Sequence, residues 1–445
     1  MKYIHNIIKI FISGMTLVAL AVLSNPVSAQ TAQPLKLSLS QAIHFAINNE
    51  PLIKEAEDQV AIAKSKADEM NSSFLPHAAV SLNYDLIGPT PYLQVPLLSD
   101  GKFYMATPNN FNEYLGVNYL IYDFDQRKET LKLLQSNEVT ESEKINLIRN
   151  QLAYQTAEVY FSMLYLQKSV DVMDQQIEDL EEHLSVARKM IATGSAIGLD
   201  TLNTSVRLTA LQNDKMNVIN QRKKAAVLLG SLMNFPKEKK FHVDGNLEEP
   251  AIRYSLDSLI NSAYMQREEL KLNKLYTRTA SLNKAVIEKS NMPVLSFNSS
   301  FGVKNGYPDN LTRIRANYVL GLTANIPVFD GFLRKSKLTT ADWQIQSTVD
   351  HATVLEQKIS TEVERALLDY RNNKVQLKTA LEEISLAQAA IDQAKGLYQS
   401  GSITNTTLLD TETALARAKL KYSYQLFQLT LSHYKLLQAE GEKIW

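Results

Sequence analysis

Residues 163–191 read MLYLQKSVDVMDQQIEDLEEHLSVARKMI, and this stretch decides the fold. Its apolar side chains recur at alternating spacings of three and four residues, at Met163, Leu166, Val170, Met173, Ile177, Leu180, Leu184, Ala187 and Ile191. A seven-residue repeat sustained in this way is typical of helices that pack as left-handed coiled coils. The segment from Asp125 to Gly194 has about 70 residues, so as one helix it would be about 105 Å long. Such a helix does not fit in a compact domain, and we therefore predict an elongated molecule.

The same spacing returns in the second half of the chain, on both sides of Gly401. Before this glycine it runs through Ile359, Val363, Ala366, Tyr370, Asn373, Leu377, Ala380, Ile384, Ala387, Ile391, Ala394 and Tyr398. After it, a returning helix shows Leu409, Thr413, Ala416, Leu420, Ser423, Phe427, Thr430, Tyr434 and Leu437. Many of these positions hold Ala, Ser or Thr, which allow close approach but bury little apolar area each. We therefore expect each helix to need further neighbours.

The second half of the chain repeats the first. Asp123 and Arg127, four positions apart, recur 207 positions later as Asp330 and Arg334. Earlier landmarks recur at a shift of 217, so the first repeat has ten extra residues between Pro76 and Asp123. Because internal repeats decide the architecture, we predict one duplicated unit with a longer loop in its first copy.

Four segments follow from this duplication. We predict a signal peptide at residues 1–29, a first repeat at 30–235, a linker at 236–253 and a second repeat at 254–445. Each repeat contains a helix, two alternating strands and a long helical hairpin, so the fold is mainly α with a smaller β part.

The strands are predicted from alternating apolar and polar residues, which give a segment one apolar and one polar face. The apolar positions are Ala78, Val80, Leu82 and Tyr84, then Leu115, Val117, Tyr119 and Ile121, then Leu295 and Phe297, then Leu320 and Leu322. Four strands per chain are too few to close a barrel, which needs about eight. Only an oligomer would close them.

The first 29 residues resemble a secretory signal peptide. Lys2 and Lys9 precede the apolar run 10–23, and Val27-Ser28-Ala29 supplies a small-residue cleavage site. A membrane anchor is the weaker alternative, because a spanning helix needs about 20 apolar residues. We therefore expect an exported protein.

Composition excludes several classes of function. The chain has 47 basic and 47 acidic residues, so its neutral balance gives no electrostatic reason to propose nucleic acid as a partner. It has no cysteine, which excludes disulfides, thiolate metal sites and thiol catalysis. Its 15 Gly and 13 Pro are few for 445 residues, and this favours long uninterrupted helices.

An enzyme is not predicted. The seven histidines form no metal-ligand spacing, and neither a G-x-S-x-G elbow nor a phosphate-binding glycine loop occurs. We accordingly predict no catalytic residue, no cofactor and no metal site.

The long helices are expected to reverse at Gly194 and Gly401, because glycine suits the left-handed conformation that ends helices. Asp200 and Asp410 follow in the first turns of the returning helices, where a carboxylate favours the positive end of the helix dipole. Capping is therefore one interpretation of both aspartates.

The order of elements, the duplication and the glycine turns together resemble the TolC-like outer-membrane efflux protein family, the outer-membrane factors of tripartite efflux or type I secretion systems. The resemblance covers about residues 35–440. Its best local matches are the Gly401-Ser-Ile-Thr-Asn-Thr-Thr-Leu-Leu-Asp410 turn and the Ile326-Pro-Val-Phe-Asp-Gly331 exit from the fourth strand.

The resemblance implies a homotrimer in the cell outer membrane, in which four strands per chain close a 12-stranded barrel. The long helices would continue that barrel as a hollow cylinder in the periplasm. Such a channel is a passive exit duct for an inner-membrane pump or secretion ATPase, reached through a periplasmic adaptor protein. Untwisting of the hairpins at their glycine turns would open it.

The resemblance also implies functional residues at the hairpin turns. The residues expected to dock the adaptor are Gly194, Ser195, Ile197, Gly401, Ser402 and Ile403. Family members often have an apolar residue directly after the glycine, where this chain has serine.

The resemblance assigns the tunnel entrance to Asp410, Thr407 and Asp200. The family can carry two carboxylates after the second glycine; this chain has Thr407 and Asp410, so only the second matches. Whether Asp410 lines a constriction or caps a helix stays open.

A periplasmic or secreted coiled-coil scaffold or adaptor without a pore is the alternative function. It would explain the heptads but not four strands placed symmetrically between helices. A heat-sensitive trimer in the outer membrane would distinguish the channel from it. The cargo, whether drug, metal or protein, is chosen mostly by the pump, and the sequence does not identify it.

Overall fold

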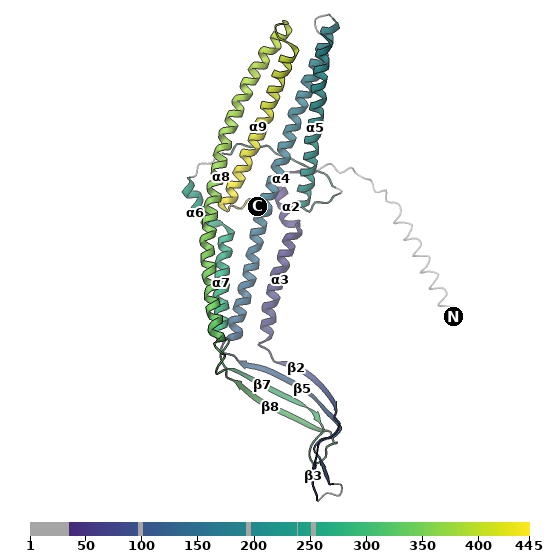
Figure 1. The fold of residues 1–445 in the computed structure, drawn as a ribbon, viewed down its shortest axis with the longest axis vertical. Coiled ribbons are helices and arrows are strands. Elements are labelled where there is room, and N and C mark those ends of the chain that lie inside the picture. The colour runs from purple at the N-terminus through teal and green to yellow at the C-terminus, as the bar shows by residue number, and fades with distance from the viewer. Residues whose placement is uncertain (1–34, 97–100, 193–196, 238, 251–254) are drawn as a thin grey trace, which may run out of the picture.

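The computed structural model describes residues 35–96, 101–192, 197–237, 239–250 and 255–445. Its elements lie along one long axis, with a sheet at one end, packed helices in the middle and two helical hairpins at the other end (Figure 1). The predicted signal peptide and part of the predicted linker lie outside the described residues.

Two helices of equal length connect the two ends of the molecule. α4 spans Gln126–Ala192 and α8 spans Leu333–Gln399, with 67 residues each. At 1.5 Å per residue each is about 100 Å long, so the prediction of very long helices is confirmed. Both begin beside the sheet and end at the hairpin turns (Figure 1). Within the described ranges, no helix combines the length and apolar character that crossing a membrane requires.

Shorter helices pack beside these two in the same order in each repeat. In the first repeat they are α2 (Leu39–Asn49), α3 (Pro51–Ser72) and α5 (Gly198–Leu232). In the second they are α6 (Leu256–Gln266), α7 (Glu268–Lys289) and α9 (Asn405–Glu440). Near the sheet the helices pack in the order α3, α4, α7, α8, whereas toward the hairpin turns the order is α5, α4, α9, α8.

The helix starts follow from local sequence. Ser38 and Gln41 form a reciprocal capping box, in which each side chain accepts a hydrogen bond from the other residue's amide, at 3.3 and 3.0 Å. Ser255 caps α6 by accepting from the amide of Ser258. Pro51 lies at the start of α3, where a missing amide costs no helical hydrogen bond.

The four-stranded sheet is shared by both repeats. Its antiparallel strands, in spatial order, are β2 (His77–Leu86), β5 (Asn109–Tyr122), β7 (Val294–Lys304) and β8 (Arg315–Asn325). The central pair, β5 and β7, comes from different repeats. The longer loop of the first repeat carries a further small hairpin of β3 (Tyr92–Gln94) and β4 (Lys102–Tyr104), which the sequence pattern did not predict.

The two faces of the sheet differ in polarity, as the alternation predicted. On one face Val80 pairs with Leu115, and Leu115 with Phe301, and all three side chains are exposed. On the other face Asn118 pairs with Asn298. This polar face carries Ser81, Asn83, Asn112, Asn118, Asn298, Ser300, Asn317 and Thr323. The part of the chain that the structure describes therefore places no covering layer on the apolar face of the sheet.

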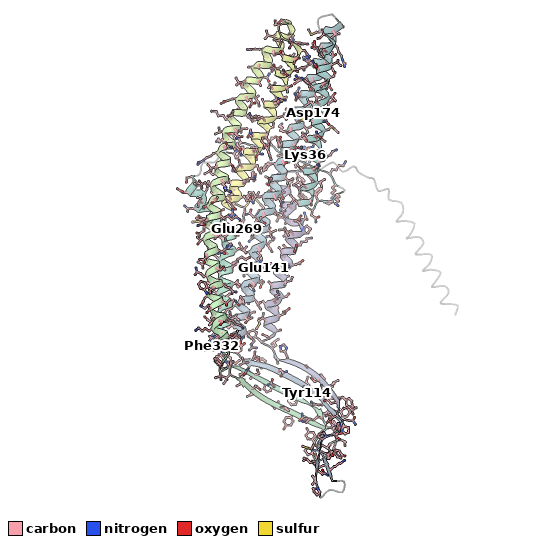
Figure 2. The ribbon with its side chains drawn as sticks, viewed as in Figure 1. Lys36, Tyr114, Glu141, Asp174, Glu269 and Phe332 are labelled. Atoms are coloured by element: carbon pink, nitrogen blue, oxygen red, sulfur yellow. The ribbon has the colours of Figure 1, made fainter. Side chains whose placement is uncertain are left out.

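Both repeats leave the sheet through the same turn. Phe124 and Asp125 have φ values of 54° and 68°, and Gly331 and Phe332, 207 positions later, have 64° and 65°. Positive φ is uncommon for residues other than glycine, so its occurrence at matching positions shows that the two repeats fold alike here. Phe332 lies at this junction between strands and helices (Figure 2).

A buried arginine fastens the first junction. The Asp123 carboxylate accepts from the amide and from Nε of Arg127, both at 2.9 Å. The same guanidinium donates to the carbonyl oxygens of Ser73 and Leu120 and lies over the ring of Phe74. The end of α3, the end of β5 and the start of α4 are thereby held together.

The second junction is fastened more simply. Asp330 accepts from the amide of Arg334 at 2.9 Å, and the Arg334 guanidinium donates to the carbonyl oxygen of Glu288 at 2.8 Å. The Asp/Arg pairs that revealed the duplication are therefore structural at both junctions.

The largest hydrophobic core lies halfway along α4. There Tyr160, 2% exposed, shares its one hydroxyl hydrogen between the carbonyl oxygens of Leu37 and Asp244, at 3.0 and 2.7 Å. Leu37 ends β1 (Leu35–Leu37) and Asp244 follows β6 (Phe241–Val243), so Tyr160 binds both strands of this parallel pair.

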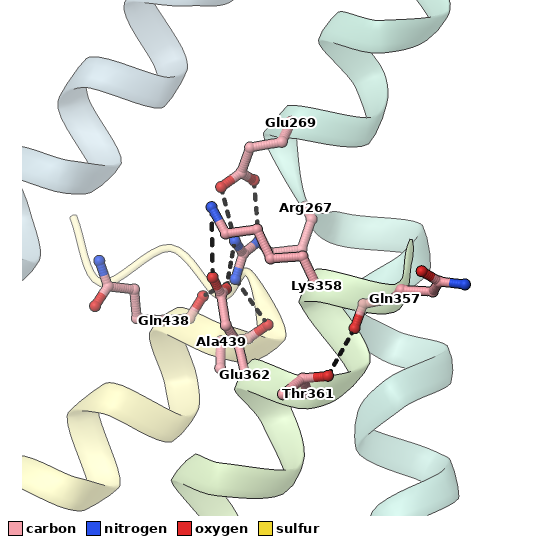
Figure 3. Close-up of polar contacts among 8 residues, drawn as sticks. All are labelled: Arg267, Glu269, Gln357, Lys358, Thr361, Glu362, Gln438 and Ala439. Carbon is pink, nitrogen blue, oxygen red and sulfur yellow. Dashed lines mark hydrogen bonds and ion pairs between the residues drawn. The ribbon is translucent and has the colours of Figure 1, made fainter. Parts of the chain in front are cut away.

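A polar joint lies at the same level on the second repeat, and we call it the equatorial joint (Figure 3). The guanidinium of Arg267, between α6 and α7, donates to Glu269, to Glu362 of α8 and to the carbonyl oxygen of Ala439 near the end of α9. Gly441 ends α9 with φ +85°, and a Cβ there would lie 3.0 Å from the Arg267 amide nitrogen. The joint therefore anchors the end of the second hairpin.

Candidate functional site

Those of the predicted entrance and docking residues that the structure describes lie where the two helical hairpins finish, at the end farthest from the sheet (Figure 1). We call this region the hairpin ends. The first hairpin is α4 and α5, and the second is α8 and α9. α4 packs against α9, so the two hairpins lie side by side, with α5 and α8 as the outer helices.

Gly401 ends α8 with a φ of +71°. Its amide donates to the carbonyl oxygen of Tyr398, and the amide of Ser402 reaches Leu397, at 3.0 and 2.8 Å. This is the pattern by which a left-handed glycine satisfies the last carbonyls of a helix. Ser402 is exposed, and its hydroxyl shares a hydrogen bond with that of Ser400. Docking of an adaptor at these residues stays a prediction.

The start of α9 is capped by threonine. Thr404 accepts from the amide of Thr407 at 3.2 Å, and their hydroxyls lie 3.0 Å apart. Thr407, predicted at the tunnel entrance, is thus part of the cap. Ile403 is half-buried and packs against the small core that contains Ile391. Asp410 lies beyond the first turn, so capping of α9 does not explain it.

The first turn is described only in part. Gly194 and Ser195 lie outside the described residues. Ile197, which follows, is 63% exposed and immediately precedes α5. The Asp200 carboxylate accepts from the Ile197 amide at 3.4 Å, in the first turn of α5. Asp200 therefore satisfies a free amide at the positive end of the helix, as the capping interpretation expects.

Asp410 joins the two hairpins. It accepts a hydrogen bond from the guanidinium of Arg207 on α5 at 2.7 Å, and the same guanidinium donates to the hydroxyl of Thr413 at 3.2 Å. The Asp410 side chain is 65% exposed and that of Arg207 32%. An ion pair this exposed contributes at most about 1 kcal/mol. The Asp410 carboxylate is therefore accessible to solvent, and Arg207 balances its charge only in part.

A buried polar cluster lies between the hairpins close to their ends. His183 of α4 is 7% exposed, and its Nε2 lies 2.5 Å from Oδ1 of Asn405 at the start of α9. Its Nδ1 lies 3.6 Å from the carboxylate of Glu412. Asn405 in turn donates to the carbonyl oxygen of Asp200 at 3.2 Å. The Tyr398 ring of α8 stacks on the imidazole, so all four helices contribute to this cluster.

The cluster favours a charged imidazole. Burial alone lowers the pKa of His183, but hydrogen bonds to Glu412 and Asn405, with the negative charges of Glu412 and Asp200, outweigh burial and raise the pKa above its ordinary value. Burial also raises the pKa of the Tyr398 hydroxyl, with Asp200 and Glu412 adding to the effect, so this ring stays neutral.

Sequence reasoning missed Arg207, His183, Asn405 and Glu412, which join the two hairpins. Arg207 and His183 meet partners 203 and 222 positions away, which no local pattern reveals. A weak signal existed for His183, because it lies next to Leu184 and three positions after Leu180 in the predicted seam. A histidine there is close enough to the contact between helices to be buried.

Hydrogen bonding and charge are the chemistry available at the hairpin ends. Along the parts of the chain that the structure describes, no group of three or more Asp, Glu or His side chains converges to hold a metal ion. Asp410 offers an exposed carboxylate, and His183 and Glu412 offer a buried ion pair between hairpins.

A family model described as outer membrane efflux protein matches residues 42–234 and 259–442. Its two matched ranges correspond to the two repeats, and the match leaves out the segment that joins them.

Individual relatives are distant but cover most of the chain. CusC of Escherichia coli strain K12, a cation efflux system protein, is 20% identical over 338 residues, which are 73% of each chain. SilC of Salmonella typhimurium, a probable outer membrane lipoprotein, is 20% identical over 417 residues, 88% of this chain and 84% of SilC. The solved structure of the Campylobacter jejuni CmeC outer membrane channel covers 91% of this chain and 85% of its own, with a TM-score of 0.74 and 16% identity.

Proposed function

This chain belongs to the outer membrane efflux protein family, and from that premise we propose that three copies form a passive exit duct. The protein is an outer-membrane efflux channel that extends into the periplasm. In the proposed assembly the sheets of three copies close a 12-stranded barrel, and the helices continue it as a hollow cylinder. An inner-membrane pump would deliver cargo to the hairpin ends through a periplasmic adaptor.

The observation that carries the proposal is that, among the described residues, the same two edges of the chain lack a neighbouring strand or helix at every level. The edge strands are β2 and β8, the outer helices near the sheet are α3 and α8, and those near the hairpin turns are α5 and α8. One edge always belongs to the first repeat and the other to the second. Joining unlike edges is a head-to-tail contact, which generates a ring when the rotation closes.

The strand directions fit such a ring. Four antiparallel strands per chain place β2 and β8 in opposite directions, so β8 of one copy meets β2 of the next as an antiparallel neighbour. In hydrocarbon every unpaired backbone group costs several kcal/mol, and closure removes both edges. β2, β7 and β8 contain 10, 11 and 11 residues, near the length at which a tilted strand crosses a bilayer.

The faces of the sheet and of the outer helices fit the same assembly. The apolar sheet face with Val80, Leu115 and Phe301 would contact lipid, and the asparagine-rich face would line the lumen. Exposed apolar side chains also follow the outer helices, for example Val206 on α5 and Leu386 on α8, with exposed fractions of 68% and 74%. Neighbouring copies would cover them.

The hairpin ends are the proposed entrance. Three copies of Asp410 around one axis would attract cations, each moderated by its Arg207. Gly194, Ser195, Ile197, Gly401, Ser402 and Ile403 are the proposed adaptor contacts. Opening would come from untwisting of the hairpins below these turns.

Electron microscopy of the detergent-extracted protein tests the assembly. We expect a three-fold hollow particle longer than about 100 Å, in a trimer that dissociates on heating. A compact or solid particle would contradict the duct and favour a coiled-coil scaffold.

Disulfide trapping tests the edges themselves, because the chain has no cysteine of its own. Ser81→Cys on β2, combined with single cysteines scanned along β8, should link copies into dimers and trimers. Asn118→Cys with Asn298→Cys is the matched control, since these residues are paired within one chain and should link without raising the mass. Links that never join two copies would refute the head-to-tail contact.

A further inference from the structure

The buried cluster at the hairpin ends has a geometry that favours a protonated His183. Asn405 donates from Nδ2 to the carbonyl oxygen of Asp200, so its Oδ1 must face His183. An amide oxygen only accepts, so Nε2 of His183 carries a hydrogen. The other ring nitrogen, Nδ1, faces the Glu412 carboxylate at 3.6 Å, which also only accepts. The hydrogen on Nε2 and the carboxylate that faces Nδ1 at ion-pair distance together favour the imidazolium form of His183.

The surroundings of this imidazolium are mostly negative or neutral. Glu412 faces it from α9, Asp200 from the start of α5, and the neutral ring of Tyr398 from α8. A cavity of about 270 Å³ between α4, α8 and α9 lies beside Glu412, and Lys395 and Lys419 are among its lining residues. One carboxylate oxygen of Glu412, Oε2, is buried without a hydrogen-bond partner. Glu412 therefore depends on His183 for compensation of its charge.

The ion pair also crosses the boundary between the two hairpins, whose untwisting is the proposed opening motion. His183 belongs to the first hairpin, whereas Glu412 and Asn405 belong to the second. Resting on the proposed exit-duct function, we propose that the His183 imidazolium is a proton-dependent latch that holds the two hairpins together, and that loss of its proton releases α4 from α9. The ligand of this site is thus a single proton.

The direction of the pH dependence follows from the contacts. A neutral imidazole has a lone pair on one nitrogen, which then faces either Asn405 Oδ1 or the Glu412 carboxylate, and both of these groups only accept hydrogen bonds. In either case the buried Glu412 carboxylate loses its counter-charge, which is strongly unfavourable. Because the pKa of His183 in the closed arrangement is raised above the ordinary 6.5, the latch is complete below that value and is lost as the pH rises through the raised pKa. The channel is therefore closed on the acidic side and opens on the basic side.

Single-channel recording of the full-length assembly in planar bilayers tests the latch between about pH 5 and about pH 8. Open probability should rise with pH. The open-to-closed equilibrium constant should increase by up to about tenfold per latch for each unit by which the closed-state pKa of His183 exceeds its open-state value. His183→Gln, which keeps a donor for Asn405 but carries no charge, should be open and independent of pH. Glu412→Gln should move the transition to lower pH. His351→Gln, at an exposed position on α8, should behave as the unaltered protein does.

Two outcomes overturn the latch: a transition that persists in His183→Gln, or an open probability that does not change with pH in the unaltered protein. An assembly that conducts without pH dependence removes only the latch, whereas a protein that forms no channel removes the exit duct itself. If His183→Gln fails to assemble, histidine NMR of the unaltered protein decides. One imidazole must titrate above 6.5, and that titration must shift in Glu412→Gln; an ordinary titration of every histidine refutes the proposal.

Discussion

Single residues fasten the strands to the helices, and Arg127 does so most completely. Its side chain is 10% exposed, and its partner Asp123 is 8% exposed. Removing one member of a buried ion pair costs about 3–5 kcal/mol, because the other charge is left without a partner. We therefore expect Arg127→Ala to lower the stability of the assembly by about that much, measured by the temperature at which trimers dissociate.

The duplication supplies a matched control for this prediction. Arg334 occupies the equivalent position in the second repeat but reaches a single main-chain oxygen outside its own turn, and its Nε has no partner. Arg334→Ala should therefore cost less, about 1.5–3 kcal/mol. Equal losses at both positions would contradict the assigned roles.

The entrance is the second place where one side chain decides an outcome. Asp410→Asn should weaken cation selectivity or cation block, because it removes a carboxylate that is 65% exposed. Arg207→Gln should have the opposite effect, since it frees that carboxylate from its counter-charge. Because the Arg207–Asp410 ion pair contributes at most about 1 kcal/mol, Arg207→Gln should change the cation-to-anion permeability ratio by no more than about fivefold. Reversal potentials in a salt gradient measure both, and unchanged values in Asp410→Asn would remove it from the entrance.

Residue roles could be predicted from sequence where the partner is near in the chain. Asp200 and the amide it caps are three positions apart, and its place in a first helical turn suggested this role. The repetition of Asp123 and Arg127 marked them as important, but not as a clamp on Ser73, 54 positions away from Arg127. Arg207 and His183 form contacts that exist only after two hairpins have packed, so no local pattern could indicate them.

At the scale of elements, the long helices were the most predictable feature, because periodicity reports directly which face is buried. Val363, Ala380 and Leu180 of the predicted seams are at most 2% exposed. Proline at Ile384, inside the seam of α8, should prevent assembly, since an interior proline costs about 3 kcal/mol or more. Ile384→Ala keeps the helical backbone and should still assemble, as judged by size-exclusion chromatography. An intact trimer with the proline would contradict the helical packing.

The strands carry a prediction of their own. A Cβ at Gly302 would lie 2.0 Å from the carbonyl oxygen of Glu113 in the neighbouring strand, whereas one at Gly321 would lie 3.9 Å from that of Asn298. Overpacking typically costs about 1–3 kcal/mol. Gly302→Ala should therefore reduce the heat stability of the assembly, while Gly321→Ala leaves it nearly unchanged. A reversed order would contradict the register of the sheet.

Short elements were the least predictable. β3 and β4 have three residues each, which is too few to show an alternating pattern. The sequence showed a loop with ten extra residues there, but the hairpin depends on cross-strand contacts such as that between the rings of Tyr92 and Tyr104.

At the scale of the whole molecule, the equatorial joint connects the part near the sheet with the hairpins. Arg267 is 8% exposed and joins the break between α6 and α7 to α8 and α9. Arg267→Met should cost about 1.5–3 kcal/mol, because it removes charged hydrogen bonds to Glu269 and Glu362, whose carboxylates are 30% and 37% exposed. Lys358→Met, at a side chain 67% exposed beside the same joint, should cost less than about 1 kcal/mol. Urea unfolding followed by tryptophan fluorescence compares them.

The overall architecture could be predicted as a class, but not in its arrangement. Duplication, long helices and two-faced strands were visible in the sequence. The order of helices across the molecule was not visible in the sequence. An apolar seam shows that a helix packs against neighbours, but it does not identify which helices they are. The free edges, from which the assembly is argued, became apparent only when the packing order was known.

At the two hairpin ends the helices stop and start at equivalent positions, but the side chains there differ in chemistry. Asp200 corresponds to Thr407, Asn203 to Asp410, and His183 to Ala390, each 207 positions apart. In the proposed trimer the entrance is then formed by six hairpins of similar shape. Two kinds of hairpin alternate around it, so each functional side chain occurs three times. A substitution in one repeat appears three times and never six. One kind of hairpin can therefore acquire a charge or a titratable side chain while the other kind keeps the packing that holds the ring together.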